Sequence, residues 1–144
     1  MRVFKFGGAS VKDAEAIRNV ARIIKKYESD PLLVVISAMG KTTNALEKIL
    51  SEFINKDKAF EQSIADLKKW HFDILDELYE GNDPSAQHQL EDLFLQFEWF
   101  FELGETENYD FLYDQIVGFG EIFSTKIITT YLHSVGIKAK WLDA

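Results

Sequence analysis

Residues Leu32 to Ile36 form an unbroken run of branched apolar side chains, and this run restricts the possible folds more than any other feature. A strand with one wet face alternates apolar and polar residues. A continuous run instead predicts a strand covered on both faces, which is typical of a parallel sheet. A second short strand is predicted over residues 2–6, directly before Gly7 and Gly8.

The residues between these strands have the pattern of an amphipathic helix from Val11 to about Glu28. Apolar side chains recur there every three or four positions, at Ile17, Val20, Ala21, Ile24 and Tyr27. We expect the helix to begin near Ser10 or Lys12-Asp13, because acids in a first turn suit the helix dipole. Strand, helix and strand make a βαβ unit, so the fold class is α/β.

The rest of the chain is mostly helical in pattern. Further helices are predicted over residues 43–56, 59–80, 84–103 and 109–133. Asp83 is the expected N-cap and Pro84 the first residue of the third of these, with Gly104 at its end. The helices within about 59–103 form an acidic helical hairpin. Gly118 and Gly120 should interrupt the last helix, and alternation over residues 137–142 predicts a third strand.

Charge and composition exclude several classes of function. The chain has 144 residues, no cysteine and a net charge of −8, and residues 47–114 alone carry 18 acidic and 5 basic side chains. An acidic chain without a basic stripe is not expected to bind nucleic acid. The longest apolar run is too short for a bilayer and no signal peptide is present, so we expect a cytoplasmic protein without a membrane partner. His71, His88 and His133 lack ligand spacing, and no metal site is predicted.

The turn after the first strand has the features of a phosphate-binding site. Gly7 and Gly8 allow an anion to approach backbone N–H groups, and the helix that follows contributes its N-terminus. Lys5 adds a cation for a transferring phosphoryl group, and Ser10 adds a hydroxyl. A purely structural Gly-Gly turn is an equally good interpretation of this segment alone, because it does not match the Walker pattern.

Two later segments carry polar groups in similar positions. Ser37 and Thr43 follow the second strand, where open α/β sheets bind ligands, although Thr42 or Thr43 would also serve as a helix N-cap. Glu121 follows Gly118 and Gly120 and lies in sequence among Phe119, Ile122 and Phe123. A lone carboxylate in an apolar setting is costly, so we expect a substrate ammonium or a salt bridge to pair with Glu121, or Glu121 to lie at a partly exposed helix end.

Together the three segments resemble aspartate kinase. The matching motifs are Lys-Phe-Gly-Gly-Ala-Ser at 5–10, Val-Ile-Ser-Ala-Met-Gly-Lys-Thr-Thr-Asn at 35–44, and Gly-Phe-Gly-Glu at 118–121 with Ser124. The resemblance spans the chain and implies a three-layer amino-acid kinase (carbamate kinase-like) fold. It also implies transfer of the ATP γ-phosphoryl group to the side-chain carboxylate of L-aspartate, with Mg²⁺, in a homo-oligomeric enzyme that begins lysine, threonine and methionine synthesis.

The resemblance also implies a role for each site residue. Lys5 would be catalytic and would bind ATP phosphates together with Gly7, Gly8 and Ser10. Ser37, Thr43 and Glu121 would bind aspartate, with Glu121 taking its ammonium group. Ala9 departs from the threonine usual in the family, which removes one hydroxyl from the turn.

The family's kinase domain is longer than this chain. Residues 1–144 would therefore be its N-terminal part, without the C-terminal half or the regulatory ACT domains, and we expect the chain alone to be inactive. Two alternatives stay open. One is another amino-acid kinase superfamily member, such as acetylglutamate or uridylate kinase, and the other is a non-catalytic interaction module that uses the acidic hairpin.

Overall fold

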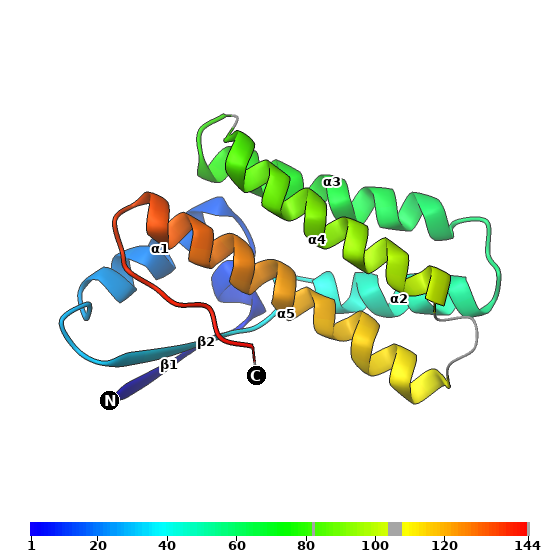
Figure 1. The fold of residues 1–144 in the computed structure, drawn as a ribbon, viewed down its shortest axis with the longest axis horizontal. Helices are drawn as coiled ribbons and strands as arrows, with labels where there is room; N and C mark the ends of the chain where they lie inside the picture. The colour runs from blue at the N-terminus through cyan, green and yellow to red at the C-terminus, as the bar shows by residue number, and fades with distance from the viewer. Residues whose placement is uncertain (82, 104–107, 144) are drawn as a thin grey trace.

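The computed structural model describes residues 1–81, 83–103 and 108–143. The elements follow one another along the chain as β1 (Arg2–Phe6), the 3-10 helix η1 (Gly8–Val11), α1 (Ala14–Lys25), β2 (Leu32–Ile36), α2 (Thr42–Ile54), α3 (Phe60–Leu78), α4 (Pro84–Leu103) and α5 (Tyr109–Ser134). Figure 1 shows the two strands at one end of the molecule, with α1 beside them and α5 running the length of the structure toward the hairpin of α3 and α4.

The two strands form a parallel sheet, as the apolar run predicts. The register pairs Arg2 with Leu32 and Phe6 with Ile36. Helix α1 connects the strands, and it begins at the later of the two expected positions, because Asp13 is its N-cap and accepts a hydrogen bond from the Ala16 backbone N–H at 2.8 Å. The residues before it form η1 instead. The βαβ unit is therefore confirmed, and its start is set by a capping side chain.

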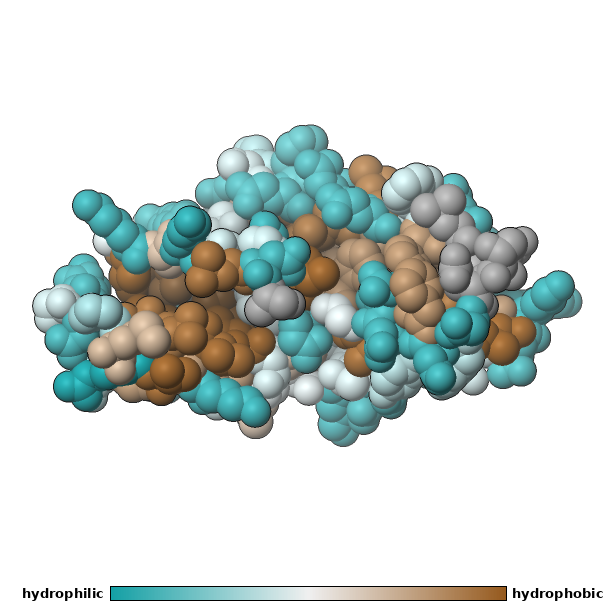
Figure 2. Space-filling view, turned by 60° about the horizontal axis from the view of Figure 1, so that its bottom comes forward, coloured by the Kyte–Doolittle hydropathy of each residue, from teal (hydrophilic) through white to brown (hydrophobic). Residues whose placement is uncertain are grey.

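The sheet has one packed face and one exposed face. Phe6, Val34 and Ile36 pack against the core on the side of α1. The alternate side chains of both strands point away from α1, and Val3 and Val35 are 59% and 44% exposed. Figure 2 shows the resulting apolar surface with a hollow beside it. The described residues thus supply the sheet and the helical layer on one of its faces.

The predicted helical hairpin is confirmed in α3 and α4. The Asp83 carboxylate caps α4 by accepting from the Ala86 N–H at 2.8 Å, and Pro84 is its first residue. Gly104, expected at its end, lies outside the described residues. The hairpin and α5 bury an aromatic core, in which the rings of Phe94 and Phe123 stack with their centroids 4.4 Å apart. Most of the aromatic side chains of α4 are therefore core, although Trp99 points to solvent.

Two sequence-based predictions about the last third of the chain are wrong. Helix α5 runs without a break through Gly118 and Gly120. Residues 137–142 are irregular and do not form a strand. Side-chain contacts hold this segment on α5 instead: His133 Nε2 lies 2.7 Å from the Ala139 carbonyl oxygen, and the Trp141 indole N–H donates to Thr125 Oγ1 at 2.9 Å.

Candidate functional site

The glycine turn is an open surface at the end of β1. Lys5 and Ser10 are exposed, and Lys5 forms no salt bridge within the described part of the chain. A Cβ atom added at Gly7 would meet no atom within 4 Å, so its backbone faces open space. No side chain caps η1, which begins after Gly7. Its first N–H groups are thus available to a phosphate, with Lys5 one residue before the turn.

Gly8 allows a close contact with the loop that follows β2, in addition to its place in the turn, and the sequence does not reveal this contact. A Cβ there would lie 2.9 Å from the Ala38 carbonyl oxygen and 3.0 Å from that of Gly40. The Gly40 N–H also donates to the Gly8 carbonyl at 3.0 Å. Any side chain at this position would therefore separate the glycine turn from the loop that follows β2. Phosphate approach is the expected reason for Gly7, whereas contact between the two loops requires Gly8.

The loop of residues 37–41 leads from β2 into α2. The Ser37 N–H extends the sheet by donating to the Phe6 carbonyl at 3.0 Å, and Gly40 turns the chain with a φ of +51°, which favours glycine. The N-cap of α2 is Lys41, and it makes no side-chain capping bond. The expectation that Thr42 or Thr43 serves as the cap is therefore wrong, since helix α2 already begins at Thr42.

The absence of a capping bond changes what the α2 N-terminus can do. Asp13 and Asn108 cap α1 and α5 with their side chains, but the start of α2 has no such partner within the described residues. Thr43 is half-buried in the first turn, and the buried Thr42 hydroxyl has no hydrogen-bond partner within the described chain. The backbone donors of this turn are suited to an anion such as a small carboxylate.

Helix α5 brings the third motif against this loop. A Cβ at Gly120 would lie 2.9 Å from Ala38 Cβ and 3.1 Å from Leu46 Cδ1, so the absence of a side chain permits the contact between α5 and the loop. Gly118 differs, because a Cβ there would meet nothing within 4 Å. We call the contacts among Gly8, Ala38, Gly40 and Gly120 the junction, because they join all three motifs.

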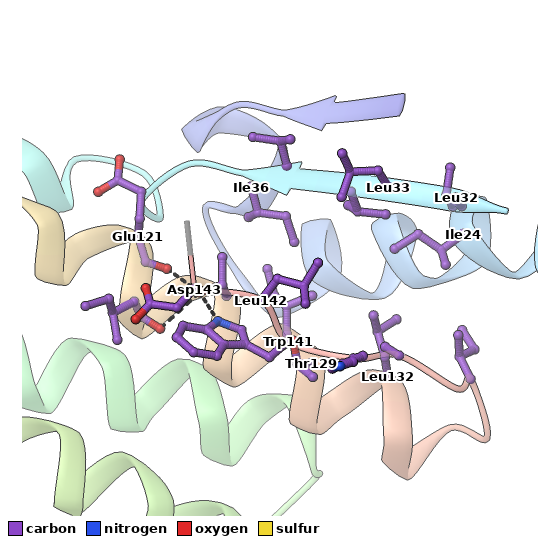
Figure 3. Close-up of a pocket in the computed structure, with 18 of the residues that line it drawn as sticks. Ile24, Leu32, Leu33, Ile36, Glu121, Thr129, Leu132, Trp141, Leu142 and Asp143 are labelled. Atoms are coloured by element: carbon purple, nitrogen blue, oxygen red, sulfur yellow. Dashed lines mark hydrogen bonds between the residues drawn. The ribbon is translucent and has the colours of Figure 1, made fainter. Parts of the chain in front are cut away.

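Glu121 is exposed rather than buried among aromatic rings. Its neighbours in sequence, Phe119 and Phe123, point to other faces of α5, so the expected apolar setting for this carboxylate is wrong. Figure 3 shows the Glu121 side chain beyond the carboxyl end of β2, at one end of a groove. The groove of about 1010 Å³ lies between β2, α5 and residues 137–143. The carboxylate is thus accessible to a ligand ammonium group.

A buried hydroxyl connects Ser37 with Glu121. Ser124 Oγ donates to the Ser37 carbonyl oxygen at 2.8 Å and lies 3.1 Å from the Glu121 carbonyl oxygen. The structure therefore brings Ser37 and Glu121 close together, and the junction connects them to the turn that follows Lys5. Ser124 is part of the matching sequence motif, but sequence reasoning gave it no role, because its partner is distant in the chain.

The hairpin supports the same loop from the other side. A Cβ at Gly40 would be 3.5 Å from Trp70 Cη2 on α3, a contact that sequence reasoning missed because nothing in the pattern relates the two segments. The neighbouring His71 is fully buried, and its Nδ1 lies 2.9 Å from the Leu67 carbonyl oxygen. Burial lowers the pKa of His71 to about 4, so the ring is neutral at pH 7. His71 is therefore a packed core residue.

The described residues offer few other candidate sites. No group of three or more His, Asp or Glu side chains within them lies close enough to hold a metal ion. None of the helices described is both long and apolar enough to cross a membrane.

Comparison with known proteins identifies relatives along the whole chain. The model of the "Amino acid kinase family" matches residues 1–144. Aspartokinase 1, chloroplastic, from Arabidopsis thaliana is 36% identical over 150 residues, which cover 99% of this chain and 25% of that protein. Aspartokinase 2, chloroplastic, from the same plant is 34% identical, with coverage of 99% and 26%. The chain thus spans about a quarter of the length of these relatives.

A solved structure agrees with the sequence comparison. The crystal structure of E. coli aspartokinase III in complex with aspartate and ADP superimposes with a TM-score of 0.81 and 25% sequence identity. The match covers 99% of this chain and 31% of that chain. The expected α/β fold of the amino-acid kinases, with its short parallel sheet, is confirmed.

Proposed function

The chain belongs to the amino acid kinase family, and from this premise we propose that it is the N-terminal part of an aspartate kinase. The observation that carries the proposal is the junction, because three motifs that are separate in sequence meet there. The turn that follows Lys5 contacts the loop 37–41 through Gly8, and Ser124 joins Glu121 to Ser37 of the same loop. Such an arrangement supports a nucleotide site next to an amino-acid site.

The proposed reaction transfers a phosphoryl group. A side-chain carboxylate oxygen of L-aspartate forms a bond with the γ-phosphorus of ATP, while the bond from that phosphorus to the β–γ bridging oxygen breaks and ADP leaves. The product is 4-phospho-L-aspartate. Lys5 stabilises the negative charge that develops on the transferring group, and the N–H groups after Gly7 hold the phosphates. Mg²⁺ brought with ATP would supply positive charge that offsets part of the charge on the phosphates.

The amino-acid site uses groups of both signs. Glu121 pairs with the substrate ammonium, since its carboxylate is exposed and lies beside the end of β2. The α2 N-terminus with Thr43, together with Ser37, receives a substrate carboxylate through N–H and hydroxyl donors. A zwitterionic amino acid satisfies both ends at once, which favours an amino-acid acceptor over a nucleotide or a sugar.

Residues beyond position 144 complete the proposed enzyme. We propose that the rest of the kinase domain and regulatory ACT domains follow this part, which carries the hairpin of about 59–103 as an insertion. The full-length protein would be a cytoplasmic homo-oligomer at the first step of lysine, threonine and methionine synthesis. The 144-residue chain alone would then release no ADP in an aspartate-dependent coupled assay. Robust turnover by the isolated chain would contradict this part of the proposal.

Replacement of Lys5 tests the function directly in the full-length protein. Lys5→Met should lower aspartate-dependent turnover roughly 10²- to 10³-fold, the usual loss for one transition-state donor. Its folding should be unchanged, because Lys5 is exposed. Lys26→Met, the same change at another exposed lysine beyond the end of α1, is the matched control and should be fully active.

The acceptor is identified with a substrate panel. Wild-type protein should phosphorylate L-aspartate in preference to N-acetylglutamate and uridine monophosphate. Equal activity of the Lys5→Met and Lys26→Met variants would show that Lys5 has no catalytic part. Preference for another acceptor would place the protein elsewhere in the family.

A further inference from the structure

Ser124 makes a hydrogen bond that reaches beyond its own helix. Its side chain is completely buried, and its hydroxyl donates to a carbonyl 87 positions earlier in the chain, that of Ser37. Serine and threonine within helices usually bond to a carbonyl three or four residues before them, as Ser134 of the same helix does with Tyr131 at 2.7 Å. Ser124 makes this local contact with Glu121 as well, but its shorter bond is the one to Ser37.

The same hydroxyl contacts the backbone of a second site residue. The Glu121 carbonyl oxygen lies 3.1 Å from Ser124 Oγ, against 2.8 Å for that of Ser37. One buried group therefore fixes the distance between the backbones that carry the proposed aspartate-binding side chains. Removal of this donor would leave the partly buried Ser37 carbonyl without this partner, which is costly.

Gly120 makes this bond possible. It lies one turn before Ser124 on α5, and Ala38 occupies the space that a side chain there would fill. A larger residue would push the loop away from the helix, and the Ser37 carbonyl would move out of reach of the hydroxyl. Helix α5 thus makes a steric contact with Ala38 and a hydrogen bond with Ser37, which are adjacent residues of the loop.

We infer that Ser124 is a positioning residue for the amino-acid acceptor: through the Ser37 carbonyl it holds the loop 37–41 against the α5 turn that carries Glu121. This inference rests on the proposed function for the identity of the acceptor. The hydroxyl itself is buried and does not touch substrate. Its effect should therefore appear in the binding of the acceptor rather than in that of the nucleotide.

Steady-state kinetics of the full-length protein test the role. Ser124→Ala should raise KM for aspartate about five- to tenfold, which is the effect of losing one net hydrogen bond, with KM for ATP nearly unchanged. Ser124→Cys keeps the packing volume but offers only a weak donor, and it should behave like the alanine variant. Ser134→Ala and Thr130→Val remove other hydroxyls of α5, the second of which joins α4 through Gln89, and both should match wild type.

Hydrogen exchange separates this inference from the proposed function. Amide exchange of residues 37–41 should accelerate in Ser124→Ala and Ser124→Cys relative to both controls, whether or not the protein phosphorylates aspartate. If wild type lacks aspartate-dependent turnover but the loop opens as expected, the proposed function fails while the positioning contact stands. If the loop exchanges as in wild type, or if Ser124→Cys behaves like wild type in both measurements, the inference is overturned.

Discussion

Gly118 and Gly120 lie two positions apart in α5, and the packing requires glycine at only one of them. Both occur in the interior of α5, where glycine costs roughly 1 kcal/mol relative to alanine. Gly120 offsets this cost by allowing contact with Ala38, whereas the space beside Gly118 is open. The sequence shows two costly glycines and predicts an interruption of the helix. Only the packing shows that one of them is required at the junction.

Alanine substitution should therefore change stability in opposite directions at these positions. Gly120→Ala places a Cβ 2.9 Å from Ala38 Cβ, so we expect a loss of about 1–3 kcal/mol in the free energy of unfolding. Gly118→Ala meets no atom and should add up to about 1 kcal/mol through helix propensity. Urea unfolding of the two variants beside wild type measures both values, and equal effects would disprove the distinction.

At the scale of elements, helix α3 supports the loop with Trp70 and buries the neighbouring His71. The imidazole of His71 contacts Phe94 and Phe123 edge-on, with ring centroids 5.6 and 5.1 Å away. Its Nε2 is buried and has no hydrogen-bond partner among the described residues. Protonation would place a cation in this aromatic core, and burial therefore lowers the pKa of His71 to about 4.

This pKa predicts a loss of stability in mild acid. The unfolded chain takes up the proton near pH 6.5, whereas the folded chain does so only near pH 4, so stability falls as the pH drops through this interval. The loss should reach roughly 3 kcal/mol below pH 4, at 1.36 kcal/mol for each pKa unit. Thermal unfolding from pH 7 to 4 should show a shallower decline in His71→Leu than in wild type. The exposed His88→Gln variant is the control and should follow wild type.

Most elements could be predicted from sequence because their signals are local. The run Leu32–Ile36 predicted a parallel strand correctly, although Leu33 and Val35 on one of its faces are exposed rather than covered within the described residues. Asp83-Pro84 marked the start of α4 correctly. The third strand was wrong because alternation alone does not supply a neighbouring strand. Lys126 lies over the Trp141 ring at 3.4 Å, and together with Thr125 it holds that segment on α5.

The candidate site was predictable only in part, for a similar reason. Motif order indicates which residues belong to it, but Ser37 and Glu121 become neighbours through Ser124, and no short-range pattern encodes that bond. The expected apolar setting of Glu121 was wrong because residues adjacent in a helix point about 100° apart. Its aromatic neighbours in sequence are therefore not its neighbours in space. The catalytic and binding roles of these residues stay predictions.

At the scale of the whole molecule, the sheet is packed on one face only. Val3, Leu33 and Val35 form an apolar surface on the other face, beside the groove under residues 137–143 (Figure 2). Apolar surfaces of this kind bind partners or cause association. In the proposed full-length enzyme, later parts of the kinase domain would cover this face.

Binding of a fluorescent apolar dye should report this surface. The 144-residue chain should bind anilinonaphthalene sulfonate more strongly than the full-length protein does. Leu33→Lys should weaken the binding, because it places a charge in the exposed apolar face. Gln96→Lys on α4 adds the same charge without removing an apolar group, and it controls for attraction of the anionic dye. Equal fluorescence of the two chain lengths would mean that this face stays uncovered.

The bond between Ser37 and Ser124 also has a consequence for synthesis on the ribosome. At 5–20 residues per second, roughly 4–17 seconds separate the synthesis of these two serines. During that interval the glycine turn and both strands already exist, yet the loop 37–41 lacks the helix that anchors it. The nascent protein therefore carries the glycine turn well before the loop 37–41 is anchored in the place that we propose for an acceptor.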